Sequence, residues 1–234
     1  MKSTSSFQIS VPLTNIRHFQ STISIWFANN GRRFPWRGPN RSSYEIVIAE
    51  ILLQRTTAKA VSNRYEDFLL KFPSWNSIVN VNIEIIEEAL KPLGLWQQKA
   101  AGLKKLSKMM LEREGSFPNS YEALITLPSI GQYIANAILL LEFNIPRPLL
   151  DTNMARVLER YFGPRKLADI RYDPYLQELA HQVVDGRDPK KINYGVLDFA
   201  SIICRPNPFC ENCIISDKCL YFSENKNSRN RRVD

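Results

Sequence analysis

The sequence lacks the hydrophobic segments that would carry a chain into or across a membrane. No apolar run approaches the roughly 20 residues that a membrane-spanning helix needs. The first residues, Met-Lys-Ser-Thr-Ser-Ser-Phe, have no apolar core of the kind found in secretory signals. Because both kinds of segment are missing, we expect a cytoplasmic protein. No internal repeat is visible in the sequence.

Cysteine is absent before residue 204, and every cysteine then falls within residues 204–219. Packing does not readily explain such a confined set, and disulfides are disfavoured in a cytosolic chain. A four-thiolate metal site remains, holding either zinc or a [4Fe–4S] cluster. The spacing, Cys-x5-Cys-x2-Cys-x5-Cys, differs from a zinc ribbon, which pairs two Cys-x-x-Cys knuckles. The ligands would be Cys204, Cys210, Cys213 and Cys219.

Acidic residues are in the minority, because 31 Lys and Arg face 23 Asp and Glu, for a net charge of +8. This balance favours a polyanionic partner, although many unrelated proteins are also basic. A hydrophobic content of 44% is enough for a real core, which argues against wholesale disorder. The 234 residues could form one domain or two small ones.

Apolar residues recur at helical spacing through most of the chain. Tyr44, Val47, Ile48, Ile51 and Leu52 follow the i, i+3, i+4, i+7, i+8 pattern of a helix with one buried face. Comparable patterns predict an all-α fold, with further helices over residues 16–27, 60–71, 82–91, 93–113, 173–185 and 190–203.

A tight hairpin between two helical patterns is expected over residues 127–133, Leu-Pro-Ser-Ile-Gly-Gln-Tyr, because Pro128 and Gly131 cannot both lie inside one good helix. Gly131 would let the backbone come close to a ligand. The unpaired amides that open the second helix could bind an anion such as a nucleic-acid phosphate. The alternative is an ordinary αα-hairpin, which the spacing alone favours.

The hairpin and the later run Leu149-Leu-Asp-Thr-Asn-Met-Ala-Arg-Val157 resemble the helix-hairpin-helix and catalytic aspartate of the endonuclease III superfamily of DNA glycosylases. The resemblance runs from about Phe34 to Cys219. The usual hairpin in that superfamily is Leu-Pro-Gly-Val-Gly. Ser129 stands in place of its first glycine, so a positive φ at this position would need another explanation.

The resemblance implies two helical domains with the DNA-binding cleft between them. One domain would join residues 1–38 to 146–220 and carry the cysteine loop. Residues 39–145 would form a six-helix domain containing the helix-hairpin-helix motif, and residues 221–234 would form a basic disordered tail.

The cysteine tract closely resembles the iron–sulfur loop of endonuclease III relatives, normally Cys-x6-Cys-x2-Cys-x5-Cys. The first gap is one residue shorter in this chain. The resemblance favours a [4Fe–4S] cluster, with zinc as the second choice. Its role would be to fold the C-terminal loop and present basic residues, not to supply redox chemistry for the main reaction.

The resemblance assigns Asp151 as the catalytic carboxylate, which would stabilise positive charge on the sugar while the N-glycosidic bond is cut. Asp151 also precedes a helical pattern that includes Met154 and Val157, where aspartate is an excellent N-cap. The two roles are compatible, because a capping position would fix the carboxylate.

The run from Glu50 to Thr57 is similar to the mismatch glycosylases of the superfamily, in which the matching glutamate faces the base pocket. The matching glutamine of adenine glycosylases, here Gln54, wedges into the base stack. The alternative is that Glu50 is an ordinary solvated residue on an amphipathic helix. Together with the hairpin, the resemblance predicts DNA contacts from Gln54, Arg55, Ser129, Gly131 and Gln132.

Two further segments have a functional and a structural interpretation. A basic face formed by Lys99, Lys104, Lys105 and Lys108 would either bind phosphate or be merely solvated. Phe34-Pro-Trp-Arg37 is expected to be extended and resembles the Pro-Trp-Arg motif of adenine and thymine mismatch glycosylases. For this segment we favour an aromatic plug on the core, with Arg37 in an ion pair.

Tyr133 stands where relatives with strand-cleaving lyase activity have a lysine that forms a Schiff base with the sugar. Tyrosine cannot form one, so we expect a monofunctional enzyme that leaves an abasic site. The runs from Glu50 to Ala58 and from Gly131 to Tyr133 look most like archaeal-type thymine/uracil–guanine mismatch glycosylases. We therefore predict removal of thymine or uracil opposite guanine in double-stranded DNA, by a nucleoid-associated monomer.

Two alternatives remain. An adenine glycosylase would act on A·G or A·8-oxoguanine pairs, with Glu50 protonating the leaving purine. This chain lacks the Gly-Tyr-Tyr segment of such enzymes, and it ends soon after the cysteine loop, so we expect no extra domain that reads 8-oxoguanine. A non-catalytic DNA-binding module is the other alternative, and the presence of Asp151, Tyr133 and Glu50 together counts against it.

Overall fold

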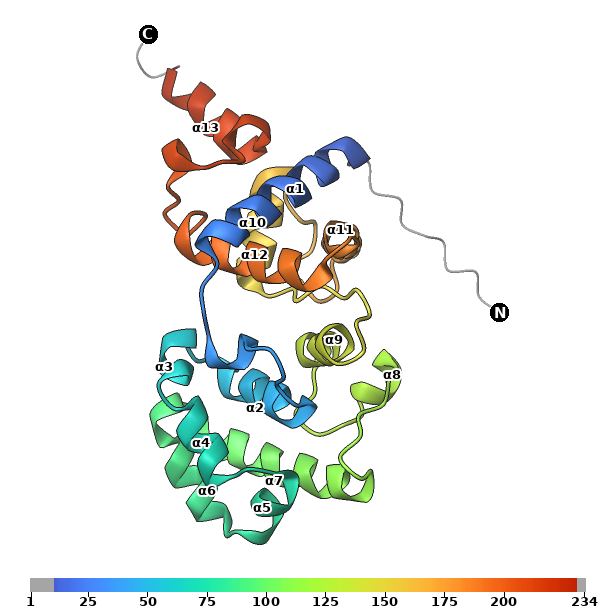
Figure 1. The fold of residues 1–234 in the computed structure, drawn as a ribbon. Helices are drawn as coiled ribbons and strands as arrows, with labels where there is room; N and C mark the ends of the chain where they lie inside the picture. Colours follow the sequence, from blue (N-terminus) through green and yellow to red (C-terminus); the bar gives the residue numbers. More distant parts are fainter. Residues whose placement is uncertain (1–10, 231–234) are drawn as a thin grey trace, which may run out of the picture. The chain divides into compact units, whose positions relative to one another are not determined.

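The computed structural model describes residues 11–230, and every regular element in that range is helical (Figure 1). No strand occurs among these residues, so the predicted all-α fold class is confirmed. None of the helices in the described range combines the length and apolar character needed to cross a bilayer.

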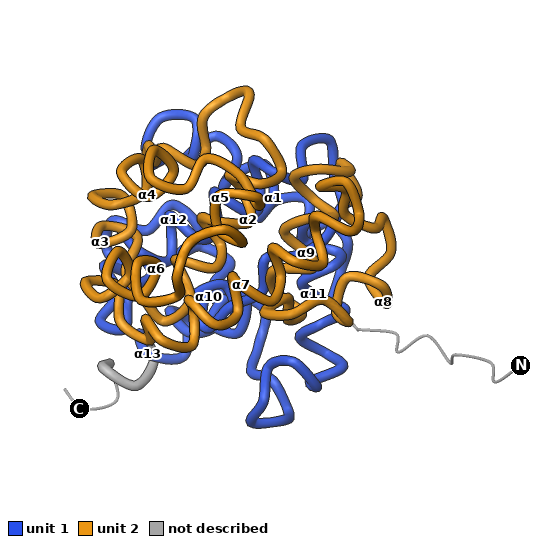
Figure 2. The backbone as a smooth tube through the Cα atoms, turned by 90° about the horizontal axis from the view of Figure 1, so that it is seen from below, with its two compact units in different colours: residues 1–32, 146–234 blue, residues 33–145 orange. Residues whose placement is uncertain are grey.

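The chain forms two compact units, coloured separately in Figure 2. Unit 1 combines Met1–Arg32 with Pro146–Asp234, and unit 2 is Arg33–Ile145. The chain thus passes between units after residues 32 and 145, where the sequence analysis placed the changes after residues 38 and 145. Each unit has its own hydrophobic core.

Unit 1 is built from long amphipathic helices, with α1 packed against α11 and α12, and α10 packed against α11, α12 and α13. Gly195 in α12 permits the close approach to α1, because a Cβ at that position would lie 2.8 Å from Cγ2 of Ile23. The helices are α1 (Leu13–Asn30), α10 (Thr152–Phe162), α11 (Pro174–Val184), α12 (Pro189–Ile202) and α13 (Leu220–Asn230).

Unit 2 has eight α-helices where the sequence predicted six. The single helix expected over residues 60–71 is broken at Asn63 and Arg64, and Ser74 starts an additional short helix with a capping box. The helices are α2 (Ser43–Leu53), α3 (Ala58–Ser62), α4 (Tyr65–Lys71), α5 (Trp75–Asn80), α6 (Ile83–Leu90), α7 (Trp96–Glu112), α8 (Tyr121–Leu124) and α9 (Gln132–Leu141).

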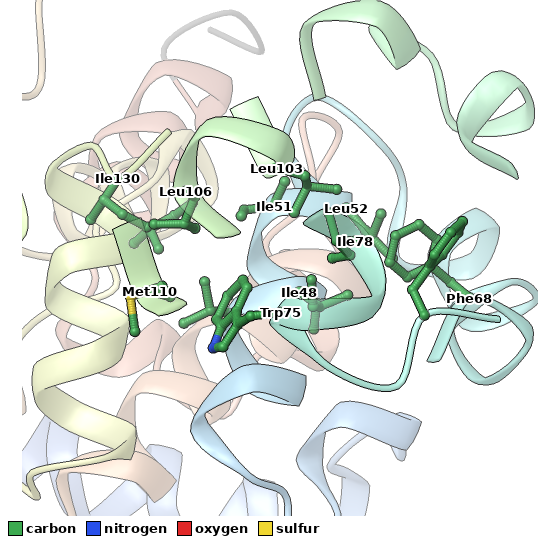
Figure 3. Packing of buried hydrophobic residues seen from close by; sticks show 14 of the residues in the cluster. Ile48, Ile51, Leu52, Phe68, Trp75, Ile78, Leu103, Leu106, Met110 and Ile130 are labelled. Atoms are coloured by element: carbon green, nitrogen blue, oxygen red, sulfur yellow. The ribbon is translucent and has the colours of Figure 1, made fainter. Parts of the chain in front are cut away.

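The core of unit 2 forms where α7 packs against α5 and α6, and α2 packs against α9 (Figure 3). Trp36 is 7% exposed and lies in this core. Its ring stacks on that of Phe34, with 4.7 Å between the ring centroids. Phe34-Pro-Trp-Arg37 is therefore an aromatic plug, as favoured, but residues Pro35–Arg37 form a 3-10 turn (η1) instead of an extended element. A second 3-10 turn, Lys91–Leu93 (η2), leads into α7.

The predicted disordered tail from residue 221 is wrong for residues 221–230, which belong to α13. Its first turn has apolar residues that the sequence analysis undervalued. The ring centroid of Tyr221 lies 4.7 Å from the guanidinium carbon of Arg160 in α10, and Leu220 packs close to Gly163. Packing of this turn supplies the helix nucleus that a polar segment lacks on its own. Residues 231–234 lie outside the described residues.

Candidate active site

The hairpin in unit 2 links α8 to α9 through residues 125–131, as the sequence predicted. Ser129 has φ +64°, in the left-handed region that normally favours glycine. Gly131 has φ −90° and ψ −178°, an extended conformation that any residue adopts, and it caps α9. A Cβ at Gly131 would meet no atom within 4 Å, so its backbone is open on that side.

Two residues on other helices accommodate the serine in this glycine position. Gln54, after the end of α2, donates a hydrogen bond from Nε2 to the carbonyl oxygen of Ser129 at 3.3 Å. Gly102, in α7, leaves room for the serine side chain, because a Cβ at Gly102 would lie 2.0 Å from Oγ of Ser129. The positive φ of Ser129 is therefore accommodated by two features: the hydrogen bond from Gln54 to its carbonyl oxygen, and the space that Gly102 leaves for its side chain.

The end of α2 carries three of the predicted site residues. Glu50 is only 6% exposed, so the solvated-residue alternative does not hold. Gln54 is half-buried against the hairpin, and Arg55 is exposed with φ +50°. Unit 2 thus brings the turn after α2 together with the hairpin before α9.

The predicted basic face on α7 is wrong for two of its four lysines. Lys99 is 2% exposed, which excludes both phosphate binding and solvation. Lys104 turns back onto the end of α5, where its Nζ donates to the carbonyl oxygens of Val79, at 2.8 Å, and Val81. Aliphatic stems long enough to reach neighbouring carbonyls allow this arrangement. Lys105 and Lys108 are exposed.

Gln132 and Tyr133 occupy the first turn of α9, and both are half-buried. Tyr133 packs against the core of unit 2. Its phenol cannot act as an amine nucleophile, so this position carries no Schiff-base chemistry.

Asp151, in unit 1, is the N-cap of α10. Its Oδ1 accepts hydrogen bonds from the backbone N–H of Asn153 at 2.9 Å and of Met154 at 2.8 Å. Its Oδ2 accepts from the side-chain amide of Asn153 at 2.7 Å. The expected cap is present, and these donors fix the orientation of the carboxylate. The catalytic role of Asp151 stays a prediction.

A chain of hydrogen bonds runs from Asp151 to the cysteine loop within unit 1. Oδ1 of Asn153 accepts from Nη2 of Arg156 at 3.2 Å. Arg156 then donates from Nε to the carbonyl oxygen of Cys204 at 2.9 Å, and from Nη2 to that of Ala200 at 3.1 Å. Neither Asn153 nor Arg156 was predicted from the sequence to contact Asp151 or the cysteine loop. The two residues follow Asp151 by two and five positions at the start of one helix, and this spacing could have indicated that they lie near it.

All four cysteines line one pocket in unit 1, and none forms a disulfide. Apolar residues such as Val157, Phe199 and Ile215 line the same pocket. Burial raises the pKa of the Cys213 thiol to about 11 and also raises that of Cys219. Thiolates here would therefore need a positive counter-charge, which a bound metal supplies.

The residues of this pocket can be compared with the requirements of a metal centre. Among residues 11–230, no group of three or more Cys, His, Asp or Glu side chains is placed so that it could hold a metal ion. By its chemistry the donor set suits a thiolate-bound centre, because all four cysteines line one pocket. The buried hydroxyl of Tyr161, which also lines it, has no hydrogen-bond partner within the described residues and could donate to a sulfur.

The helix-hairpin-helix of unit 2 and the capped aspartate of unit 1 define the class that the sequence resemblance pointed to. The family described as HhH-GPD superfamily base excision DNA repair protein matches residues 48–179. The chain belongs to this superfamily.

Individual relatives are similar over most of the chain. The thymine/uracil-DNA glycosylase of Methanothermobacter thermautotrophicus is 36% identical over 209 residues, covering 88% of this chain and 94% of the relative. The adenine DNA glycosylase of Buchnera aphidicola subsp. Acyrthosiphon pisum is 30% identical over 211 residues, covering 89% of this chain but 60% of the relative. The solved structure of a thermostable thymine-DNA glycosylase matches with a TM-score of 0.84 at 35% identity, covering 90% of this chain and 98% of that one.

Proposed function

We propose that the protein is a monofunctional DNA glycosylase that removes thymine or uracil mispaired with guanine. The observation that carries this proposal is the 36% identity to a thymine/uracil-DNA glycosylase, which extends over 88% of this chain. The geometry of the hairpin and of the capped aspartate is compatible with that reaction, since it orients a carboxylate and leaves helix-opening amides for a phosphate.

In the proposed reaction the target nucleotide is first extruded from the duplex, because its glycosidic bond is inaccessible inside the stack. The bond between C1′ and the base nitrogen then breaks, and its electron pair leaves with the base. Water forms the new bond to C1′, and its proton balances the charge on the departing base. Asp151 stabilises the positive charge that develops on the sugar, from a carboxylate held by Asn153 and Met154.

The residues of unit 2 recognise the lesion in this proposal. Glu50, buried in α2, lines the base pocket, and Gln54 and Arg55 contact DNA from the turn that follows. The hairpin residues Ser129, Gly131 and Gln132 bind the backbone through the amide end of α9. Tyr133 leaves the reaction without a covalent step on the enzyme, so an abasic site is the product.

The cysteine loop holds a [4Fe–4S] cluster in our proposal, with Cys204, Cys210, Cys213 and Cys219 as ligands. When bound, such a cluster supplies structural cross-linking of the C-terminal loop. Arg160 supports the same region, since its Nη1 donates to the carbonyl oxygen of Arg205 at 2.7 Å and lies 3.5 Å from Sγ of Cys204. The enzyme works on double-stranded mismatched DNA at the nucleoid, as a monomer.

Adenine removal is the second candidate. The identity to an adenine DNA glycosylase is lower, at 30%, and this chain spans 60% of that relative's length. A purely DNA-binding module is disfavoured, because the 36% identity to a thymine/uracil-DNA glycosylase extends over 88% of this chain.

The test is a panel of 5′-labelled duplexes carrying T·G, U·G, A·G or A·8-oxoguanine, with alkali used to reveal abasic sites. We expect alkali-dependent cleavage of T·G and U·G only, and no covalent adduct when borohydride is added. Cleavage of the two adenine duplexes alone would replace the proposal with the adenine alternative. A borohydride-trapped adduct would refute the monofunctional assignment.

A further inference from the structure

Lys99 is a buried cation with three oxygen acceptors and no carboxylate partner. It lies in the first turn of α7 and is 2% exposed. Its Nζ donates to the carbonyl oxygen of Leu52 at 2.8 Å, to Oγ1 of Thr56 at 2.7 Å and to the carbonyl oxygen of Leu93 at 3.1 Å. Within residues 11–230, no acidic side chain lies at ion-pair distance from it.

Burying an unpaired ammonium is costly, and lysine is almost never fully buried without a partner. Burial lowers the pKa of Lys99 to about 8, which is the direction this cost dictates. Three hydrogen bonds satisfy all three ammonium protons, and the carbonyl of Leu52 belongs to the negative end of α2. The arrangement is thus a fully satisfied cation, and two of its three acceptors, Leu52 and Thr56, lie at the end of α2 and in the turn after it.

Arg55, in the turn from α2 into α3, has φ +50°, in the left-handed region that is unfavourable for an L-residue. Thr56, beside it, is hydrogen-bonded through its hydroxyl to Lys99, and its N–H donates to the carbonyl oxygen of Leu53 at 3.0 Å. Lys99 therefore holds the residues on both sides of Gln54 and Arg55.

The same turn supports the hairpin. Gln54 donates to the carbonyl oxygen of Ser129, the hairpin residue with φ +64°. Leu93, the third acceptor of Lys99, ends η2, so the ammonium also fixes where α7 begins. One buried charge thus connects the turn after α2, the start of α7 and, through Gln54, the hairpin before α9.

We propose that Lys99 is a positioning residue for mismatch recognition, whose ammonium holds the turn bearing Gln54 and Arg55 in its DNA-contacting conformation. This inference rests on the proposed function, because Gln54 and Arg55 contact DNA only in that proposal. Lys99 itself touches neither DNA nor the reacting atoms.

If Lys99 had a purely structural role, its removal would have the same effect as removal of another lysine that binds backbone carbonyls. Lys104 is the matched control for this comparison. Lys104 lies in the same helix and also donates to two backbone carbonyls, those of Val79 and Val81 at the end of α5. Lys99→Met and Lys104→Met both remove an ammonium from helix-end carbonyls. Only Lys99→Met releases the turn after α2.

The experiment compares wild type, Lys99→Met, Lys104→Met and Thr56→Val in single-turnover excision from a T·G duplex, at a temperature where melting shows each variant folded. For Lys99→Met we expect the half-saturating protein concentration to rise about tenfold or more, with a smaller change in the rate at saturation. Thr56→Val removes one of the three acceptors together with the hydroxyl's own hydrogen bonds to the carbonyl oxygens of Gln54, at 3.2 Å, and Leu93, and it should change in the same direction. Lys104→Met should stay near wild type.

Hydrogen exchange of the amides at residues 54–57 is the readout that does not depend on activity. We expect faster exchange there in Lys99→Met and Thr56→Val, but not in Lys104→Met. If Lys99→Met does not fold, Lys99→Gln, which removes the charge but keeps N–H donors, replaces it in both measurements.

Equal losses in Lys99→Met and Lys104→Met, or unchanged exchange at residues 54–57, would overturn the positioning role. If wild type itself excises no thymine, the proposed function fails, while the exchange data still decide whether Lys99 orders the turn.

Discussion

Ser129 adopts a backbone conformation that its relatives' usual hairpin assigns to glycine. A left-handed φ costs an L-residue about 1–2 kcal/mol, and Ser129 sits at φ +64°. Gly102 accommodates the serine, because its missing side chain leaves the space that Oγ of Ser129 occupies. The two positions should therefore be energetically coupled, although Gly102 lies in α7 and Ser129 in the hairpin before α9.

A double-mutant cycle of Ser129→Gly and Gly102→Ala tests this coupling. Ser129→Gly should raise the free energy of unfolding by up to about 1 kcal/mol, since relief of the φ strain exceeds the added entropy of the unfolded chain. Gly102→Ala should gain about 1 kcal/mol of helix propensity only in the Ser129→Gly background, because the new Cβ otherwise meets Oγ of Ser129. Urea unfolding measures both, and additive effects would show that the two residues do not interact.

For individual side chains, local features could be predicted from the sequence, but long-range contacts could not. The cap at Asp151 is a local feature, set by the helix that follows it, and the sequence predicted it. Lys99 and Lys104 were placed on a basic face because lysine is normally exposed. Their ammonium groups instead meet carbonyls 47 and 25 residues away in the chain. Such contacts depend on how helices pack, which local periodicity does not contain.

At the scale of helices, the long amphipathic elements were predictable and the short ones were not. α10 has an apolar stripe that a regular period reveals. The same period predicted α2, although residues 47–52 are all buried and not one face alone. α5 and α8 have six and four residues, too few to show a period. α13 was missed because its stability comes from packing of its first turn on α10, and its remaining residues are polar.

The metal centre proposed for the cysteine loop can be measured directly. Protein purified under conditions that protect iron–sulfur centres should be brown, absorb broadly in the visible range and contain about four iron atoms per chain. The physical reason is the donor set, four thiols that line one apolar pocket. Elemental analysis gives the stoichiometry, and a matched Cys213→Ser preparation should lose iron. An active, colourless protein with one zinc per chain would assign the loop to zinc.

For the whole molecule, the net charge of +8 and membership of a DNA repair superfamily lead to a prediction about salt. Binding to a T·G duplex should weaken as salt rises, because each neutralised phosphate releases counterions. Arg55→Ala should reduce the slope of log K against log salt by about 0.9, the value for one phosphate contact. Lys104→Met should leave it unchanged, since that ammonium is bound to carbonyls. A flat plot for wild type would contradict phosphate binding by this chain.

In the proposed function, the capped carboxylate of Asp151 drives removal of thymine from a T·G pair. Asp151→Asn removes the negative charge but keeps a side-chain oxygen, and asparagine and aspartate rank alike as N-caps. Melting temperature and binding to the mismatched duplex should therefore stay near wild type, and both serve as controls.

The decisive measurement is the single-turnover rate of thymine release from a T·G duplex by wild type and Asp151→Asn, which is free of slow product release. We predict that the substitution lowers this rate about 10²- to 10³-fold, the typical effect of losing one electrostatic contact to the transition state. An asparagine variant that releases thymine at close to the wild-type rate would contradict the claim. Asp151 would then be a helix cap alone, and Glu50 would become the candidate catalytic carboxylate.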